Sequence, residues 1–268
     1  MNIGNGSSPA PVFVHPGPNA DRTAALPKRF YKEVTVVPQE DGFAVRLDGR
    51  ATLTPARKPL SLPSQALADA VAAEWVAIET VIDPRVMPFT RLCNSAIDGV
   101  GASFDSVLAD VTRYAGSDLL VYRAGEPQKL VDAQAAVWDP VVAWSRDELR
   151  APLILAEGVM FVAQPEASLQ KLGDAVRQLA GEGLGAPFRL AALHVMTTLT
   201  SSVLLALAVA ARRLTWQQAW AAAHVDEDHQ ISEWGADEEA AERRARREID
   251  MQVAAEVYRL SSGVVETE

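Results

Sequence analysis

The side chains most able to do chemistry are concentrated between His224 and Glu239, in HVDEDHQISEWGADEE, which holds two histidines and seven carboxylates. Imidazoles and carboxylates together could bind a metal ion or form an acid/base pair. However, His224 and His229 are five residues apart, which places them about 140° apart around a helix. Zinc-binding helices instead carry histidines four residues apart, as in H-E-x-x-H. A metal-dependent hydrolase using His224 and Asp228 is therefore kept only as the alternative function.

The carboxylates of this stretch favour a protein-binding surface. The i, i+4 pairs Glu239–Arg243 and Glu242–Arg246 have the order that stabilises an exposed helix. Four carboxylates have no cationic neighbour at helical spacing: Asp226, Glu227, Asp228 and Asp237. Because an aromatic side chain beside unpaired charge is typical of docking surfaces, the group around Trp234 is interpreted as a contact site for another protein.

Other motifs for catalysis are weak or absent. The GEGLG stretch at 181–185 follows an expected helix and lacks the Lys-Ser/Thr ending of a phosphate-binding loop. No G-x-S-x-G elbow occurs. Cys93 lies among apolar residues, which favours a buried structural thiol. We therefore expect a protein that is not an enzyme and needs no cofactor or metal.

Composition narrows the class of partner. The chain has 268 residues, of which 49% are hydrophobic and 22% charged, as in a folded globular protein. Its formal net charge of −10 disfavours nucleic acid and anionic membranes as partners, since both attract basic surfaces. The single cysteine excludes internal disulfides and fits a reducing compartment.

Two segments bear on localisation. Residues 1–27 are rich in Pro, Gly, Ser and Asn and lack a secretory apolar core, so we expect a flexible leader and a bacterial cytoplasmic protein. Residues 190–211 contain no Asp, Glu, Lys or Arg and have the length of a membrane span. This segment also carries His194 and five hydroxyl residues, so a buried helix of a soluble protein is favoured over stable membrane insertion.

The spacing of apolar residues changes along the chain. Residues 30–37, 43–47 and 50–54 are β-branched and aromatic runs, which predict strands, and Asp48-Gly49 predicts a tight hairpin. From Ser64 onward the apolar spacing becomes helical. The expected helices follow Ser64, Phe89 and Phe104 and then cover 128–149, 166–179, 187–214, 216–234 and 238–260.

Local signals mark where some of these helices begin and end. Thr215 and Gln218 form a T-x-x-Q capping box. Gly235 should end one helix, and Asp237 should cap the next. The overall prediction is an α+β protein, with a small antiparallel-sheet N-terminal domain followed by a larger all-helical C-terminal domain. The expected divisions are a leader at 1–27, an N-terminal domain at 28–95 and a helical domain at 96–268.

Several stretches together resemble a known family. They are RFYKEVTV, VRLDGRATLTPARKPLSLPSQALADAVAAEW, IDPRVMPFTRLCNSAID, DLLVYRA, WDPVVAWS and QISEWG. They are similar to the ATP12 family of chaperones, which assist assembly of the F1 sector of ATP synthase. The resemblance spans about Lys28 to Leu260 and is densest from Asp48 to Asp98.

The resemblance implies a chaperone that binds the unassembled F1 α subunit and prevents its aggregation before the α and β subunits assemble. It also implies a functional role for Trp75 and for an acidic position after the Trp-Gly pair. Trp75 lies on the apolar stripe of its helix, so its expected role is structural. The expected partner-binding residues are Glu238, Glu239, Asp237, Glu227 and Trp234. The sequence does not determine the oligomeric state, and a monomer is expected.

Overall fold

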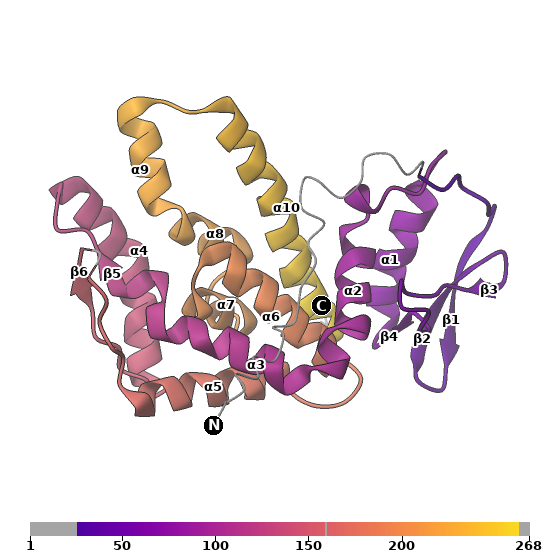
Figure 1. The fold of residues 1–268 in the computed structure, drawn as a ribbon, viewed down its shortest axis with the longest axis horizontal. Helices are drawn as coiled ribbons and strands as arrows, with labels where there is room; N and C mark the ends of the chain where they lie inside the picture. The colour runs from indigo at the N-terminus through magenta and orange to yellow at the C-terminus, as the bar shows by residue number, and fades with distance from the viewer. Residues whose placement is uncertain (1–25, 159, 263–268) are drawn as a thin grey trace, which may run out of the picture.

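The computed structural model describes residues 26–158 and 160–262 and shows a small antiparallel sheet followed by ten α-helices (Figure 1). The α+β prediction is confirmed. Apart from Leu26 and Pro27, the predicted leader lies outside the described residues. The strands of the sheet are β1 (Val34–Gln39), β2 (Gly42–Leu47), β3 (Arg50–Ala51) and β4 (Ser61–Leu62).

The sheet has β1 and β3 on either side of β2, with β4 also paired to β2, and all pairs are antiparallel. The hairpin predicted at Asp48-Gly49 is confirmed, because both residues have positive φ (49° and 77°) and join Leu47 to Arg50. β1 starts later than predicted. The Asp48 carboxylate accepts hydrogen bonds from the amides of Lys32 and Glu33 (3.0 and 2.9 Å), so these amides do not pair with a strand.

Helix α1 (Gln65–Ala77) packs against this sheet. Ser64 caps it by accepting a hydrogen bond from the Leu67 amide, and Leu67 and Val71 are fully buried. The Ser64 hydroxyl also donates to the Leu260 carbonyl at the far end of the chain (2.8 Å). The sheet layer is therefore joined directly to the C-terminal helix.

The remaining helices form the larger part of the molecule, with α6 and α7 at its centre (Figure 1). Their bounds are α2 (Pro88–Asp98), α3 (Phe104–Arg113), α4 (Gln128–Asp147), α5 (Glu166–Ala180), α6 (Ala186–Thr200), α7 (Val203–Ala210), α8 (Trp216–Ala223), α9 (Val225–Trp234) and α10 (Glu238–Ser261). Short 3₁₀ segments cover Pro84–Val86, Val100–Ala102, Tyr114–Ser117 and Leu119–Val121. A two-residue parallel pair, β5 (Tyr122–Arg123) and β6 (Ala156–Glu157), lies beside α4 (Figure 1).

One continuous cluster of buried apolar residues extends from the sheet, at Val45 and Leu62, to α10, at Met251 and Val257. Helix α2 lies between α1 and α6 and also contacts α10 (Figure 1). The sheet layer and the helical part thus share one core. The division of the chain at residue 95 stays a prediction.

The expected helix over 187–214 is wrong as a single element, because it breaks between α6 and α7. Ser201 takes a left-handed conformation (φ 55°), and the Ser202 hydroxyl accepts a hydrogen bond from the Leu205 amide. Each half is buried inside the protein. Within residues 26–158 and 160–262, no helix is long and apolar enough to span a bilayer.

The expected helix over 216–234 is likewise two helices, α8 and α9, which meet at His224. The His224 backbone (φ −113°, ψ 15°) leaves the helical region there. The predicted capping box of Thr215 and Gln218 is confirmed, with both hydrogen bonds present. Gly235 ends α9 with φ 90°, and Asp237 caps α10 by accepting from the Ala240 amide (2.7 Å), both as predicted.

Candidate protein-binding site

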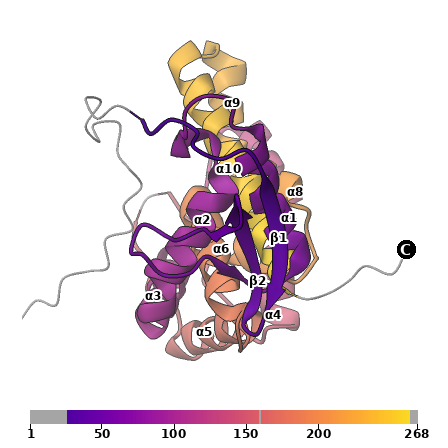
Figure 2. The ribbon, with the colours of Figure 1, turned by 90° about the vertical axis from the view of Figure 1, so that its right-hand side faces the viewer.

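Residues 226–239, here called the acidic corner, comprise most of α9, the turn at 235–237 and the start of α10. Figures 1 and 2 show that this corner projects beyond the rest of the helices. It contains all the residues that the sequence singles out for partner binding. Its geometry therefore decides which of their side chains are available to a second protein.

Helix α9 is held mainly by polar contacts, because none of its residues is buried. The Gln134 amide on α4 donates to the Asp226 carboxylate (2.7 Å). Lys129, also on α4, pairs with Glu233 (3.3 Å). On the other side, Arg244 of α10 pairs with Asp228.

The expectation that four carboxylates lack partners is therefore corrected. Asp228 does have a cationic partner, Arg244, which lies sixteen residues further along the chain on a different helix. Its carboxylate raises the pKa of the Arg244 guanidinium, chiefly through this hydrogen bond. Asp237 is used as a helix cap. The Glu227 carboxylate lies 3.9 Å from His224 Nε2, which is the long limit of an ion pair.

The first turn of α10 carries Glu238, the carboxylate of the acidic corner that is most available to a partner protein. The predicted pairs Glu239–Arg243 (2.6 Å) and Glu242–Arg246 (3.3 Å) are both present. The neighbouring Glu238 is exposed, and no described residue forms a hydrogen bond or ion pair with its carboxylate. Glu238 is therefore free to meet a cation of another protein without first breaking an internal pair.

Trp234 lies at the end of α9, four residues before Glu238 in the sequence. Trp234 is 82% exposed, the highest value among the large apolar residues of the described chain. Trp234 and Ile231 border a groove of about 450 Å³ between α9 and α10, whose α10 wall includes Ala241 and Ala245. The acidic corner thus combines an exposed aromatic side chain, a shallow apolar groove and an unpaired negative charge, which are the features of a docking surface.

The geometry around His224 does not favour the metal alternative. His224 is buried, its Nδ1 lies 2.7 Å from the Trp220 carbonyl oxygen, and its ring lies 3.9 Å from the Trp220 ring. Burial lowers the pKa of this imidazole. Asp228 instead pairs with Arg244. Within the described part of the chain, no three His, Cys, Asp or Glu side chains gather as a metal site would require.

Trp75 lies far from the acidic corner, on the α1 face toward the sheet. Its ring meets Tyr31 edge-on, with centroids 5.8 Å apart, and the Tyr31 hydroxyl donates to the Trp75 carbonyl (2.7 Å). The side chain packs against a small apolar cluster that contains Leu47 and Ile78, and also against the main core. Trp75 therefore joins α1 to the sheet.

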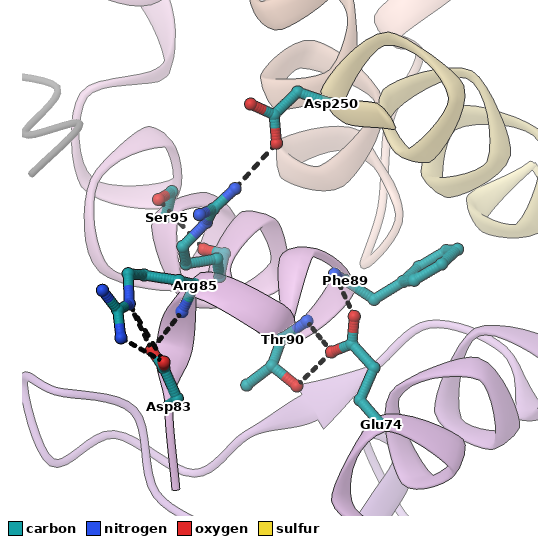
Figure 3. A network of polar contacts seen from close by, with 8 residues as sticks. Glu74, Asp83, Arg85, Phe89, Thr90, Ser95 and Asp250 are labelled. Atoms are coloured by element: carbon teal, nitrogen blue, oxygen red, sulfur yellow. Dashed lines mark hydrogen bonds and ion pairs between the residues drawn. The ribbon is translucent and has the colours of Figure 1, made fainter. Parts of the chain in front are cut away.

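Glu74, which precedes Trp75, ties α1 to α2 and was not among the residues predicted from the sequence. Its carboxylate accepts from the amides of Phe89 and Thr90 (2.7 and 2.8 Å) and from the Thr90 hydroxyl (2.7 Å), as Figure 3 shows. Burial raises its pKa. The only sequence signal for this contact is that α2 begins at Pro88 without a capping side chain of its own.

Cys93 is fully buried in α2, and burial raises the pKa of its thiol. A thiol in this state is a poor nucleophile. This geometry favours the structural interpretation of the cysteine.

A family model and several solved structures relate the chain to known proteins. A family model described as ATP12 chaperone protein matches residues 28–146. The structure is similar to that of the Atu1473 protein of Agrobacterium tumefaciens, described as a candidate chaperone, with 48% identity and a TM-score of 0.82, over 88% of this chain and 86% of that one. It is also similar to Atp12 from Paracoccus denitrificans, with 43% identity and a TM-score of 0.81, over 88% of this chain and 98% of that one. A lysine-for-aspartate variant of that protein matches equally well.

Proposed function

The chain belongs to the ATP12 chaperone family, and from this premise we propose that it binds the unassembled α subunit of the F1 sector of ATP synthase. Binding would prevent aggregation of that subunit until it meets the β subunit. An unassembled subunit exposes the apolar surface that its neighbours later bury, and such surfaces aggregate. A stoichiometric binding protein is sufficient for this task, so the proposal needs no catalytic centre and no cofactor.

The observation that carries the choice of surface is that the projecting acidic corner holds both the exposed Trp234 and the unpaired Glu238. A chaperone has to hold its client and then release it. This requirement favours a moderate interface with a few aromatic anchors and a charged rim. Trp234 supplies the anchor, and Glu238 supplies the charge with the least competition from internal ion pairs.

The other predicted contact residues have graded roles in this proposal. Glu239 can reach the client only by sharing its charge with Arg243. Asp237 and Glu227 contribute negative potential at the groove while Asp237 also caps α10. The surface thus suits a client segment that combines an apolar side chain with a Lys or Arg. We further propose that the protein acts as a cytoplasmic monomer that does not bind nucleic acid.

The direct test is to mix the purified protein with isolated F1 α subunit and, separately, with isolated β subunit. Size-exclusion chromatography with light scattering then measures the mass of any complex. We expect a stoichiometric complex with α and less turbidity when α is warmed with the protein. Failure to form a complex with α, or equal binding to β, would contradict the proposed partner.

A further inference from the structure

A second cavity lies away from the acidic corner, where α2, α6 and α10 meet. It encloses about 420 Å³, within the range of cavities that hold a small ligand or a few side chains of a peptide. One wall comes from α2, which follows the sheet layer, and the other two come from the helical part. It is called the α2–α6–α10 cleft below.

The lining of this cleft is mainly aliphatic. Leu92 of α2 faces Val195 and Leu199 of α6, and Val253 of α10 contributes a further methyl surface. Leu92, Val195 and Leu199 are only partly buried in the free protein. An apolar side chain entering here would remove their exposed area from water, and that transfer is favourable.

Two arginines occupy the polar side of the cleft, and they differ in how far their charge is neutralised. Arg91 of α2 pairs with Asp250 of α10 (2.7 Å), and this pair joins two walls of the cleft (Figure 3 shows Asp250). Because the pair is internally satisfied, it contributes little net charge. Its role is to hold α2 beside α10.

Arg247 of α10 is exposed and has no such partner. Its guanidinium donates to the Leu199 carbonyl (2.9 Å), near the C-terminal end of α6, and no described carboxylate forms an ion pair with it. A guanidinium has five N–H donors, and this bond uses one of them. The remaining N–H groups can bind a carboxylate in bidentate geometry at the edge of the aliphatic wall.

We propose that the α2–α6–α10 cleft is a second client-binding site, which takes a leucine-like side chain followed by a carboxylate, as in an acidic, aliphatic polypeptide segment. The aliphatic walls receive the side chain, and Arg247 receives the carboxylate. The proposal rests on the chaperone role of the family and is independent of the acidic corner. The cleft has the opposite charge preference to the corner, so one α10 helix would hold two chemically different segments of a client.

The test uses a rhodamine-labelled, amidated peptide, GSLLEGS, and its glutamine analogue, GSLLQGS, in fluorescence anisotropy titrations with the full chain. We expect the glutamate peptide to bind about tenfold more tightly, as a charge-assisted hydrogen bond would provide. Arg247→Gln should weaken binding of the glutamate peptide by the same factor and leave the affinity for the glutamine peptide unchanged. Val195→Phe, which fills the apolar wall, should weaken both peptides.

Arg246→Gln is the matched control, since Arg246 is also exposed on α10 but pairs with Glu242 outside the cleft. It should leave both affinities unchanged, and circular dichroism should show that every variant is folded. Equal binding of the two peptides, or an equal effect of both arginine variants, would overturn the proposal. Displacement of the glutamate peptide by inorganic phosphate, together with no effect of Val195→Phe, would also overturn it by showing an anion site only. Because no α subunit is used, none of these outcomes bears on the proposed F1 partner.

Discussion

Arg244 of α10 donates a hydrogen bond to Asp228 of α9, and this ion pair spans the two helices of the acidic corner. It joins α9 directly to α10, while the other contacts of α9 are polar ones to α4 and the packing of Val225 against the core. The orientation of Trp234 at the end of α9 therefore depends on a polar contact.

Replacing Arg244 with Met should loosen α9 without unfolding the protein. Partly exposed ion pairs contribute about 0–1 kcal/mol to the free energy of unfolding, so urea denaturation should change little. Amide hydrogen exchange in residues 225–234 should become faster, since the tether to α10 is lost. Arg246→Met, which removes a pair within α10 alone, is the control and should leave this exchange unchanged. Unchanged exchange in Arg244→Met would show that other contacts hold α9.

Trp75→Ala should destabilise the fold by about 3 kcal/mol, the low end for truncation of a packed aromatic residue, because Trp75 is only partly buried. The lost contacts are those with Tyr31 and with the apolar clusters between α1 and the sheet. Trp75→Phe should recover part of the loss, because it keeps an aromatic ring. Urea denaturation measures both values. A variant that keeps full stability but loses client binding would contradict the structural role of Trp75.

The buried Asp118 carboxyl should make the free energy of unfolding depend on pH. It is fully buried and accepts from the amides of Leu120 and Leu204 (3.0 and 3.1 Å), and burial raises the pKa of its carboxyl from 3.8 to about 6. Since the folded pKa is the higher one, the folded state holds the proton that the unfolded state has lost between these values. The contribution of Asp118 to the free energy of unfolding should therefore fall as pH rises from about 4 to about 6.

The comparison with Asp118→Asn isolates this contribution, because asparagine does not titrate. The free energy of unfolding, measured by urea denaturation at several pH values, should fall less steeply between about pH 4 and 6 in the variant. Near pH 7 the variant should still be about 1–3 kcal/mol less stable, because an amide NH₂ cannot accept from both backbone N–H groups. Identical pH profiles for the two proteins would contradict a raised carboxyl pKa.

Trp234→Ala should separate stability from binding. The side chain is exposed in the free protein, so its removal should change the free energy of unfolding by less than about 0.5 kcal/mol. If Trp234 anchors the client, the same change should weaken binding to the α subunit by about tenfold or more. Isothermal titration calorimetry measures the affinity. An exposed apolar residue elsewhere, Val86, provides the control as Val86→Ala.

Local signals in the sequence predicted the parts of the fold that depend on near neighbours. The Asp48-Gly49 hairpin, the Thr215 capping box and the Asp237 cap each involve residues within a few positions of one another. The glutamate–arginine pairs on α10 are likewise near neighbours, four residues apart. These contacts are fixed by helix and turn geometry, so their spacing is enough to find them.

The parts that the sequence did not predict depend on contacts between distant segments. Asp226 meets Gln134, and Asp228 meets Arg244 on another helix, so helical spacing wrongly left Asp228 unpaired. The breaks at Ser201 and His224 lie in stretches without Gly or Pro, so no helix-breaking residue marks them in the sequence. The α2–α6–α10 cleft needs three elements to be placed before it exists. Tertiary packing decides all of these features.

The most direct test of the proposed function compares Glu238→Lys with Glu166→Lys in binding to isolated F1 α subunit. Both glutamates are exposed in the first turn of a helix, α10 and α5, so each variant loses a similar helix-dipole interaction of about 0.3–1 kcal/mol. Calorimetric titration should show at least tenfold weaker binding for Glu238→Lys and wild-type affinity for Glu166→Lys, with both variants folded. Wild-type affinity in folded Glu238→Lys would contradict the acidic corner as the site that holds the client.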